Sequence, residues 1–547
     1  MSELLAKQSV PALDEGLAKR RAPLPSLRAV FLLWLPAGLA AAAVLLPIVY
    51  LILRATGSGA SAWALVWQTS TLQIVGRTAW LAFSVTLAST AVAVPLAWLT
   101  VRTNLPLRRM WTVLTPLPLV IPSYVGAYLL ASALGPRGML QSWLEGPFGI
   151  TRLPEIYGFP GALMILTFLS YPFILLSVRA ALQKMDPSLE EAARSLGLNS
   201  WQTFWRVIFP QLRPAIATGG LLVALYVLRD FGAVSIMRYN TFTRVIYTQY
   251  QSSFDRTAAA TLALVLVSMT LALLVVETRS RGRARYAASA TSSAKPPGVF
   301  PLGRWRWPAL LFCALIVLLA LLIPAGELVY WLVRGLQAGE RVTGLFPAVR
   351  NSVLASGLAA AATLLAALPV AVASVRRPNF YSRLFERVTY IAFALPGIVI
   401  ALALVFFAAN YALPLYQTLP LLVFAYGILF IPEAVGAART SLLQVHPSME
   451  EAGRSLGQKP LQVFRKVTLP MVRPGLLAGG GLVFLTTMKE LPATLILAPY
   501  GFQTLATEVW SAVSEAFFAK AAAPALLLVL VSSLPMALLI FRDMKDR

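Results

Sequence analysis

Two stretches of this chain, 260 residues apart, have closely similar sequences. Residues 187–214 read PSLEEAARSLGLNSWQTFWRVIFPQLRP, and residues 447–474 read PSMEEAGRSLGQKPLQVFRKVTLPMVRP. Roughly half of the aligned positions are identical, and the match continues into the next apolar stretch, where Arg229-Asp230 aligns with Lys489-Glu490. Solvated loops of internal repeats usually diverge. We therefore interpret the repeated segment as one held constant by a common partner.

The composition places both copies in a membrane. Of the 547 residues, 58% are hydrophobic and only 12% are charged, whereas soluble domains carry about 25% charged residues. These values exclude an ordinary soluble enzyme, a disordered regulator and a secreted disulfide scaffold. One cysteine, Cys313, and one histidine, His446, exclude an internal disulfide and a metal site built from several such residues. The sequence is therefore that of a polytopic membrane protein.

The apolar stretches predict about twelve transmembrane helices, because a helix needs about 20 apolar residues to cross a bilayer. We count Val388–Pro432 as two crossings, with a break near Asn410–Pro420, where turn-forming residues gather. The other predicted spans are Ala29–Leu53, Thr78–Val101, Met110–Pro136, Ile156–Val178, Pro214–Met237, Thr257–Val276, Trp307–Gly326, Asn351–Val375, Pro474–Leu497 and Ala521–Phe541. Six spans per copy is an even number. We therefore expect an all-α membrane protein of two parallel six-helix repeats, related by an axis along the membrane normal.

The basic residues predict the orientation. With the N-terminus inside, 33 of the 46 Lys and Arg residues fall on the cytoplasmic side and 11 outside, as the positive-inside rule requires. Topology and contact with anionic lipid thus account for the net charge of +24 without nucleic acid. The predicted parts are a cytoplasmic tail (1–28), a first transmembrane half (29–278), a cytoplasmic linker (279–306) and a second half (307–547), with both termini cytoplasmic.

Each repeated segment predicts a short helix with defined ends. Ser188-x-x-Glu191 and Ser448-x-x-Glu451 have the spacing of capping boxes, after Pro187 and Pro447. Gly197 and Gly457 stand where a left-handed residue would end the helix. Ala192-Ala193 and Ala452-Gly453 predict a smooth face, and we expect a second short helix to end at Pro210 or Pro470. Such a helix suits insertion into a partner's groove; the other interpretation is a surface helix that only connects two spans.

These residues resemble the EAA loop of binding-protein-dependent ABC importer permeases. The matches are Glu191, Ala192, Ala193, Gly197, Ile208 and Pro210 in the first copy, and Glu451, Ala452, Gly457 and Pro470 in the second, where Gly453 and Thr468 depart from the usual Ala and Ile. The resemblance implies the type I permease fold in a bacterial inner membrane. The ATPase-coupling residues that it implies are Glu190, Glu191, Ala192, Ala193, Gly197, Glu450, Glu451, Ala452, Gly453 and Gly457.

The resemblance also implies partners. No P-loop motif is present, and no Gly-Lys dipeptide occurs in the chain, so we expect ATP to be hydrolysed by two copies of a separate ABC ATPase subunit. We expect this chain to bind no cofactor itself, and a periplasmic or extracellular binding protein to deliver the substrate. Fused permeases of this kind are typical of ferric-iron importers, which the stretches around Arg229-Asp230 and Lys489-Glu490 resemble most. Thiamine and aminoethylphosphonate are the alternative substrates.

The charge pairs within the fifth span of each half are candidates for the translocation path. Charged residues inside a membrane are costly and usually face the bundle interior or a water-filled route. Arg229, Asp230, Lys489 and Glu490 could therefore line the path, or they could be packing pairs that fix helix rotation. Adjacent residues cannot pair well on one helix, so partners are needed, and Glu327 and Glu433 are possible ones.

Other residues and functions remain open from the sequence. Tyr226, Tyr239, Tyr247 and Tyr250 could offer oxygen ligands to a ferric ion, or could be aromatic residues of the membrane interface. His446 is expected to be solvated, and Cys313 to face lipid or the core. A secondary carrier with six-plus-six repeats driven by an ion gradient is the main rival function. A membrane scaffold without transport is a second one.

Overall fold

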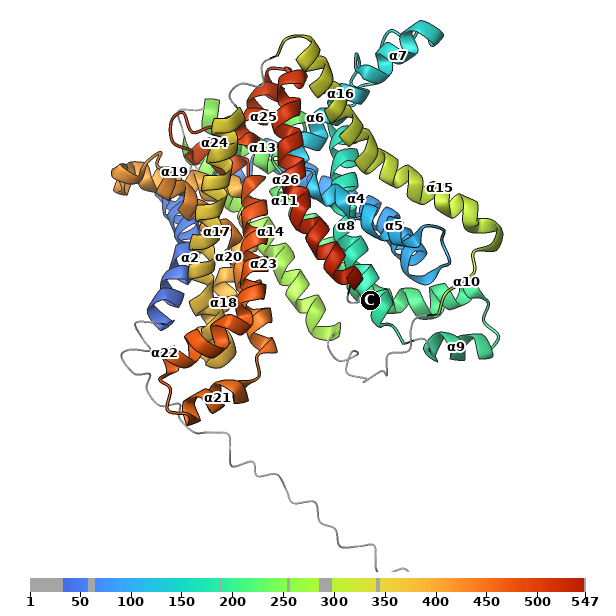
Figure 1. Ribbon diagram of the computed structural model, residues 1–547. Helices are drawn as coiled ribbons and strands as arrows, with labels where there is room; N and C mark the ends of the chain where they lie inside the picture. The colour runs from blue at the N-terminus through green and yellow to red at the C-terminus, as the bar shows by residue number, and fades with distance from the viewer. Residues whose placement is uncertain are drawn as a thin grey trace, which may run out of the picture.

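The computed structural model describes residues 33–57, 64–186, 188–252, 256–284, 298–340 and 345–545, and these are almost entirely helical (Figure 1). Within them, the β-structure is one isolated bridge between Thr103 and Phe300. Nine helices of this part are long and apolar enough to cross a membrane, and two bent helix pairs could form two further spans. Together with α26 (Phe518–Lys545) they coincide with the twelve predicted spans. The all-α membrane fold is confirmed.

The helices of the first half follow the apolar stretches and the repeated segment. They are α2 (Leu35–Thr56), α4 (Thr69–Arg102), α5 (Arg108–Leu114), η3 (Leu117–Val120), α6 (Ser123–Leu134), α7 (Met139–Phe148), α8 (Phe159–Lys184), α9 (Ser188–Ser195), α10 (Ser200–Thr203), η4 (Phe204–Ile208), α11 (Phe209–Arg229), α12 (Gly232–Ile236), α13 (Phe242–Ser252) and α14 (Arg256–Ala284). The predicted tail 1–28 and Pro187 lie outside the described residues.

The second half repeats this order. Its helices are η6 (Gly303–Trp305), α15 (Arg306–Val317), η7 (Leu318–Leu322), α16 (Ile323–Gln337), α17 (Leu345–Arg376), α18 (Phe380–Ile391), η8 (Ala392–Ala394), α19 (Gly397–Tyr411), η9 (Leu413–Leu415), α20 (Leu419–Gln444), α21 (Pro447–Ser455), α22 (Pro460–Val463), η10 (Phe464–Thr468), α23 (Leu469–Met488), α24 (Pro492–Leu497), α25 (Leu505–Ser514) and α26. The expected break near residues 410–420 is confirmed, since α19 ends at Tyr411 and α20 begins at Leu419.

Two predicted spans are broken rather than straight. The chain over Met110–Pro136 bends by 97° between η3 and α6, and the first crossing within Val388–Pro432 bends by 106° before α19. Pro122 and Pro396 stand directly before α6 and α19 and are their N-cap residues. A proline removes a helix hydrogen bond and clashes with the preceding turn, so the helix ends there and a new one starts in another direction. The prediction of unbroken spans is wrong at these two places.

Three helices form the core of each half. In the first half α4, α8 and α11 pack together, and in the second α17, α20 and α23 do so. The repeated glycine pair explains how closely they approach: a Cβ on Gly219 would lie 2.6 Å from Ile174 Cα, and one on Gly479 would lie 2.5 Å from Ala437 Cβ. Small residues that permit close backbone approach are the usual contact residues between membrane helices.

The outer helices are exchanged between the halves. α2 packs against α17, α18 and α19, and α14 contacts α19 and η8, all of the second half. Conversely, α16 packs against α6, and α26 contacts η3 and α6, of the first half. In Figure 1, α2 accordingly lies beside α17 and α18, while α15 and α16 lie on the side of α4, α5 and α8. The predicted halves are thus sequence units whose end helices pack on the other unit.

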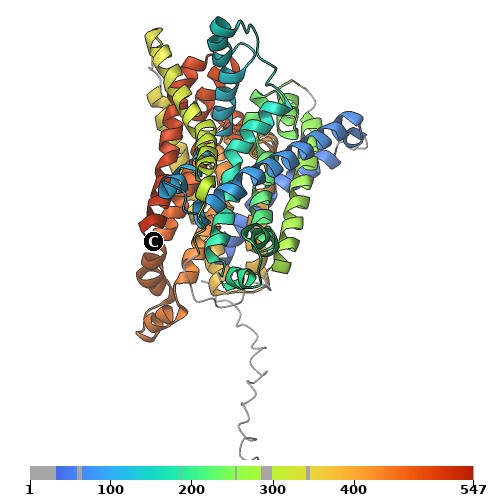
Figure 2. The ribbon, with the colours of Figure 1, turned by 90° about the vertical axis from the view of Figure 1, so that its right-hand side faces the viewer.

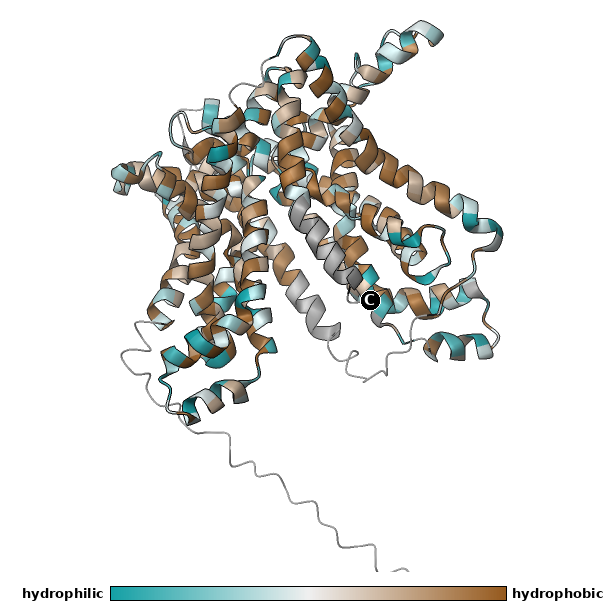
Figure 3. Cartoon of the chain, in the orientation of Figure 1, coloured by the Kyte–Doolittle hydropathy of each residue, from teal (hydrophilic) through white to brown (hydrophobic). Residues whose placement is uncertain are grey.

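Polar and apolar residues separate along the long axis of the molecule. In Figure 3 the long helices are mostly brown along their middle, and teal residues gather at α9, α21 and α22 at one end. The turned view in Figure 2 keeps these short helices at the end opposite α7. Such a band of apolar surface between polar ends is what a bilayer requires.

Candidate functional site: the EAA segments and the charged helix breaks

The two repeated segments lie at the same end of the molecule (Figure 1). We call residues 188–208 (α9, α10 and η4) the first EAA segment and residues 447–468 (α21, α22 and η10) the second. Each segment joins the fourth span of its half, α8 or α20, to the fifth, α11 or α23. A shared end is what parallel repeats predict, because both copies then have the same orientation in the membrane.

The first helix of each EAA segment includes the serine that a capping box would place just before it. His446 is the N-cap of α21, and its Nδ1 accepts from the Ser448 backbone N–H at 3.3 Å. In the first segment Asp186 Oδ1 accepts from the Ser188 N–H at 2.9 Å. Ser448 therefore lies inside its helix, because Pro447 takes the first helical position, which suits proline. The predicted capping role of the serines is wrong, and the aligned residues Asp186 and His446 were missed.

The helix ends agree with the sequence. Gly197 has φ +83° and Gly457 has φ +80°. The N–H of Leu198 bonds to the carbonyl of Ala193 and that of Gly197 to Arg194, with the same pattern in the second segment. These are the two bonds of a Schellman motif. The left-handed glycine that the spacing predicts is therefore present in both copies.

One glutamate of each pair points inward and fixes the segment to its own half. Glu190 is 4% exposed and forms an ion pair with the fully buried Arg102 at the end of α4. Glu450 is 7% exposed and pairs with Arg376 at the end of α17, with 2.9 Å between Oε1 and Nε. The outer neighbours Glu191 and Glu451 are exposed. The two glutamates, predicted together as coupling residues, thus face different surroundings.

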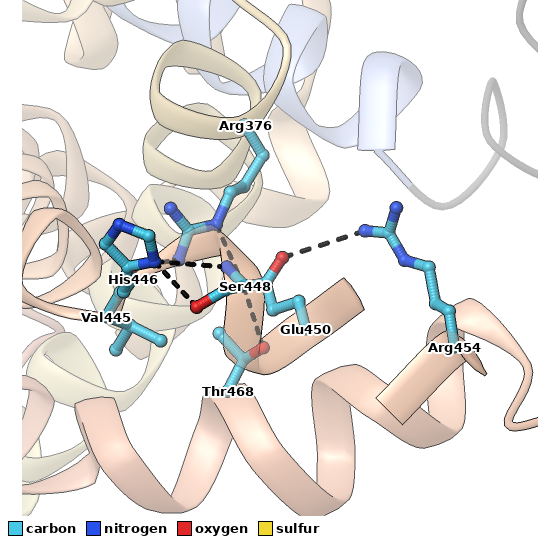
Figure 4. Close-up of polar contacts among 7 residues, drawn as sticks. All are labelled: Arg376, Val445, His446, Ser448, Glu450, Arg454 and Thr468. Atoms are coloured by element: carbon cyan, nitrogen blue, oxygen red, sulfur yellow. Dashed lines mark hydrogen bonds and ion pairs between the residues drawn. The ribbon is translucent and has the colours of Figure 1, made fainter. Parts of the chain in front are cut away.

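Figure 4 shows the network around Glu450. Thr468 Oγ1 donates to Glu450 Oε1 at 3.0 Å, and Arg454 lies 3.7 Å from the other carboxylate oxygen. Arg376 also donates to the Val445 carbonyl at 3.0 Å, just before the N-cap residue of α21. Arg376 therefore links the end of α17 both to the residue before the N-cap of α21 and to Glu450 in the first turn of that helix.

The small residues of the segment lie on two faces, not one. Ala193 and Gly453 are buried, and a Cβ on Gly453 would lie 3.2 Å from Val463 of α22. Ala192 and Ala452 are exposed, as are Leu196 (83%) and Leu456 (82%) at the helix ends. The expectation of one smooth face is wrong because adjacent helical residues point about 100° apart. The exposed face combines one small residue with one large apolar residue.

The second helix of each segment does not stop at its proline. It continues through a π-helical turn, η4 or η10, into the membrane helix that carries Pro210 or Pro470 in its first turn. Since proline has no N–H to donate, a wider π turn before it can accommodate the missing bond. The predicted stop is therefore wrong: the second helix of each segment is a continuous extension of α11 or α23.

The linker between the halves contacts the first EAA segment. Phe300 exchanges backbone hydrogen bonds with the end of α4, through Arg102 O at 2.8 Å and Asn104 N at 3.2 Å. Its ring lies 4.3 Å from the guanidinium carbon of Arg194 in α9 and packs on Trp98. This cation–π contact ties the chain between the halves to the first segment.

Both predicted charge pairs lie where a helix ends. α11 stops at Arg229 and α12 begins at Gly232; α23 stops at Met488 and α24 begins at Pro492. Asp230 Oδ1 accepts from the Ala233 N–H at 2.9 Å, and Glu490 Oε1 accepts from the Ala493 N–H at 3.2 Å. The acids therefore cap the short helices that follow them, at a distance of about 30 Å from the start of α11.

The two acids predicted as possible partners of the charge pairs, Glu433 and Glu327, differ in their surroundings. Glu433 of α20 interacts electrostatically with Arg229 of the first half and with Lys489, so it is a partner of both bases. Glu327 of α16 has other partners: it accepts from Ser132 of α6, which in turn accepts from Trp331 Nε1 at 3.0 Å.

Aromatic side chains join the halves at the end away from the EAA segments. Trp510 of α25 packs on Phe231, with ring centroids 5.1 Å apart, and hydrogen bonds to Tyr247. Tyr250, which aligns with Trp510, packs on Phe406 of α19 at 6.3 Å. Tyr226 packs on Phe173 and Tyr239 on Phe159.

Among the described residues no three His, Cys, Asp or Glu gather as metal ligands. Cys313 is fully buried.

A family model describes both halves. Residues 89–280 and 344–542 each match the binding-protein-dependent transport system inner membrane component. The chain belongs to this family. Each match includes one EAA segment and one charged helix break of this inner membrane component.

Relatives of this inner membrane component match over both halves or over one. The Fe(3+)-transport system permease protein FbpB 2 of Haemophilus influenzae is 36% identical over 498 residues, covering 90% of this chain and 95% of the relative. The ferric transport system permease protein FbpB of Actinobacillus pleuropneumoniae is 25% identical, covering 86% and 71%. The molybdenum transport system permease protein ModB of Escherichia coli is 33% identical over 172 residues, which cover 30% of this chain.

Proposed function

We propose that this chain is the membrane permease of an ATP-driven importer of ferric iron. The observation that carries the proposal is the pair of EAA segments, clamped to their own halves and exposed at one end of a twelve-helix membrane protein. The similarity to ferric permeases extends over nine tenths of the chain and over both halves, whereas the similarity to the molybdenum permease covers less than one third of it. Ferric iron is therefore the favoured substrate.

The exposed face of each EAA segment is the proposed docking site for an ATPase subunit. Leu196 and Leu456 are the most exposed large apolar residues of their segments, at 83% and 82%. Exposed apolar surface rimmed by polar residues marks a protein–protein interaction site. Two equivalent segments support two ATPase subunits, which would supply the ATP hydrolysis for which this chain has no P-loop.

The end with the EAA segments is then cytoplasmic. This orientation agrees with the excess of Lys and Arg on that side of the sequence, and it places both termini in the cytoplasm. The substrate-binding protein would dock at the opposite end, where α7, α13 and α25 lie (Figure 1). Lipid would surround the apolar band.

The proposed route runs between the halves. The contacts of Trp510 with Phe231 and Tyr247 join the halves on the outer side, near the charge pairs. Transport by alternating access requires these contacts to separate when the outer side opens. Closure of the two ATPases would be passed to α11 and α23 through the second helix of each EAA segment, since this helix is continuous with its membrane helix.

Reconstitution tests the importer. The complete complex, with ATPase and binding protein, is placed in proteoliposomes, and uptake of labelled ferric iron is measured with ATP or with a proton or sodium gradient alone. ATP-dependent uptake of iron supports the proposal; uptake driven by a gradient without ATP would indicate a secondary carrier instead. Thiamine and aminoethylphosphonate, each with its own binding protein, are the substrate controls.

The docking role has a separate test. Leu196→Glu and Leu456→Glu are exposed changes, so the membrane yield should stay normal, while the ATPase that co-purifies with the double variant should fall about tenfold or more. Leu413→Glu, at a 68% exposed position in η9, which lies between two membrane helices and away from the segments, is the matched control. Normal ATPase recovery with the double variant would remove the docking role from this face.

A further inference from the structure

A cavity of about 320 Å³ lies between the two halves, at the end of the molecule opposite the EAA segments (Figure 1). Its wall is formed by α6, α7 and the turn between them in the first half, and by α16 and α26 in the second. The cavity therefore lies at the contact that arises because α16 and α26 pack on the other half.

Two arginines line this cavity, and no acid among the described residues lines it. Arg137 follows the end of α6, and Arg334 lies in the last turn of α16. The guanidinium carbon of Arg334 lies 5.4 Å from the ring centre of Trp331, and its Nη1 donates to Tyr330 Oη at 3.0 Å. A guanidinium has five N–H donors, so most of these donors remain for a ligand. Neither arginine forms an ion pair within the part of the chain that the structure describes.

The buried acid of this region lies behind the wall of the cavity. Ser132 of α6 lines the cavity and is 4% exposed. Its hydroxyl donates to Glu327 and accepts from Trp331 Nε1 at 3.0 Å. Glu327 itself does not line the cavity. The charged side chains of the wall are therefore the two arginines, and the cavity suits an anion.

The aligned helices of the other copy show the same arginine covered by an aromatic ring. The outer helices share the pattern V-Y-x-x-x-R, at residues 49–54 in α2 and 329–334 in α16. Arg54 is thus the counterpart of Arg334. α2 packs on α19 as α16 packs on α6, and the guanidinium carbon of Arg54 lies 6.0 Å from the ring centre of Phe406 in α19.

α6 has a small residue where α19 has that ring. Pro122 and Pro396 stand directly before these two helices. Ten residues further on, the chain has Ser132 in α6 and Phe406 in α19. The ring that covers the arginine in one copy is therefore missing in the other, and a cavity lies beside Arg334 instead.

The cavity lies where the helices leave the apolar band. Trp143 and Trp331 line it together with two tyrosines, and such residues gather where a membrane meets water. Ile323, two turns before Tyr330 on the same side of α16, is 43% exposed, and Leu319, one turn further, is 37% exposed. An exposed apolar strip therefore runs from the cavity toward the middle of the membrane.

We propose that this cavity binds the phosphate group of an anionic phospholipid, with the acyl chains along the exposed side of α16. A guanidinium matches the oxygens of a phosphate in both charge and geometry, and basic pockets between transmembrane helices bind the head groups of anionic lipids. The lipid would touch α6 and α16 together. It would thereby stabilise the contact between the halves on the side opposite the EAA segments, whatever the cargo is.

Native mass spectrometry of the purified full chain, titrated with phosphatidylglycerol or phosphatidylcholine, tests the site. Both lipids carry a phosphate, but only phosphatidylglycerol has a net negative charge. The wild type should bind one phosphatidylglycerol in preference to phosphatidylcholine. Arg137→Gln together with Arg334→Gln should weaken this binding about tenfold or more, because the charge-assisted hydrogen bonds are lost.

Two further variants separate charge and position from general effects. Arg137→Lys together with Arg334→Lys keeps the charge and should retain most of the binding. Arg54→Gln removes the aligned arginine that Phe406 covers in the other copy, so it is the matched control and should bind phosphatidylglycerol like the wild type. All four arginine positions of these variants are exposed or lie at helix ends, so the unfolding temperature in phosphatidylcholine should stay that of the wild type.

Several results would overturn the proposal. They are equal binding of phosphatidylglycerol by the wild type and the double Gln variant, an equal loss in Arg54→Gln, or binding by the double Lys variant as weak as that of the double Gln variant. Displacement of the lipid by millimolar inorganic phosphate would indicate a site for a free anion instead. If the wild type shows no preference for phosphatidylglycerol and the double Gln variant loses the substrate-binding protein, the arginines are a docking surface for that protein.

Discussion

The two EAA segments share a sequence but are held in place by different contacts. The first depends on an ion pair with Arg102, which is fully buried and lies below the ring of Phe300. The second depends on Arg376, whose side chain is 17% exposed, with Thr468 and Arg454 as additional partners of the same glutamate. The position of Thr468 is occupied by Ile208 in the first segment, and the role of Arg454 changes in Arg194 to a contact with Phe300.

The difference shows which part of the motif is needed for the fold and which is adapted. The inward glutamate, the arginine at the end of the second span and the left-handed glycine are common to both segments. The hydroxyl, the second arginine contact and the linker ring are not. A docking helix can therefore be fixed to a permease half either by burial or by a shared polar network.

The largest difference between the segments should appear when the inward glutamate is removed. Glu190→Ala leaves Arg102 buried and unpaired, which should lower the free energy of unfolding by about 3–5 kcal/mol. Glu450→Ala should cost only about 1–3 kcal/mol, because Arg376 keeps its bond to the Val445 carbonyl. Thermal unfolding of the purified protein measures both.

The exposed neighbours provide the control for that prediction. Glu191→Ala and Glu451→Ala should change the free energy of unfolding by less than about 0.5 kcal/mol each, as surface changes usually do. Equal losses for Glu190→Ala and Glu450→Ala would show that burial of the arginine does not distinguish the segments.

Removing the left-handed glycines should affect both segments equally. Gly197→Val and Gly457→Val force a β-branched residue to φ near +80°, at a cost of about 1–2 kcal/mol. No atom lies within 4 Å of either Cβ position, so the cost is one of the backbone alone. Co-purification of the ATPase should fall for both variants. Asn tolerates this conformation, so Gly197→Asn and Gly457→Asn should retain most of the ATPase co-purification. Unequal losses for the two Val variants would mean that a partner contacts one of the glycines.

Phe300→Ala should weaken the first segment and leave the second unchanged. The contact of Phe300 with Arg194 is worth about 0.5–2 kcal/mol. A double-mutant cycle for unfolding, with Arg194→Ala, should show this coupling energy, and the same cycle with Arg454→Ala should show none. Coupling of Phe300 to Arg454 would contradict the arrangement of the linker.

The smallest effect is expected at Thr468. Thr468→Val keeps the shape but removes one hydrogen bond to Glu450, and should cost about 0.5–1.5 kcal/mol. Ile208→Val in the first segment is the matched change without a hydrogen bond, and about 0.5–1.5 kcal/mol is typical for the lost methyl group. A double-mutant cycle of Thr468→Val with Glu450→Gln, measured by thermal unfolding, separates the loss of the hydrogen bond from a change in packing. Additive effects would remove Thr468 from the network.

The sequence was sufficient to predict the structural features that depend on local patterns of residues. Apolar length located the spans, and the spacing from Glu191 to Gly197 located the helix end, because both features arise within a few residues. It did not predict the breaks before α6 and α19, although Pro122 and Pro396 were visible as signals. Helix-breaking prolines are common in membrane helices, so a proline alone does not show which span will bend.

The remaining errors concern contacts over long distances in the chain. That Glu190 faces inward depends on Arg102 in another helix, and that Asp230 caps α12 depends on where α11 ends. The aligned residues Asp186 and His446 each stand directly before a proline in the sequence, and this pattern could have identified them, since proline favours the first helical position. The exchange of outer helices has no local signal, since an apolar helix can pack on either half.

That exchange has a consequence for how the protein is made. α2 is the first described helix to leave the ribosome, yet its partners α17, α18 and α19 begin about 310 residues later, at Leu345. At about 5–20 residues per second, α2 remains in the bilayer for some 15–60 seconds without these partners of the second half, although α14, which it also contacts, follows earlier in the chain. During synthesis its exposed side faces lipid or a membrane chaperone, and the interface closes only after most of the second half has been inserted.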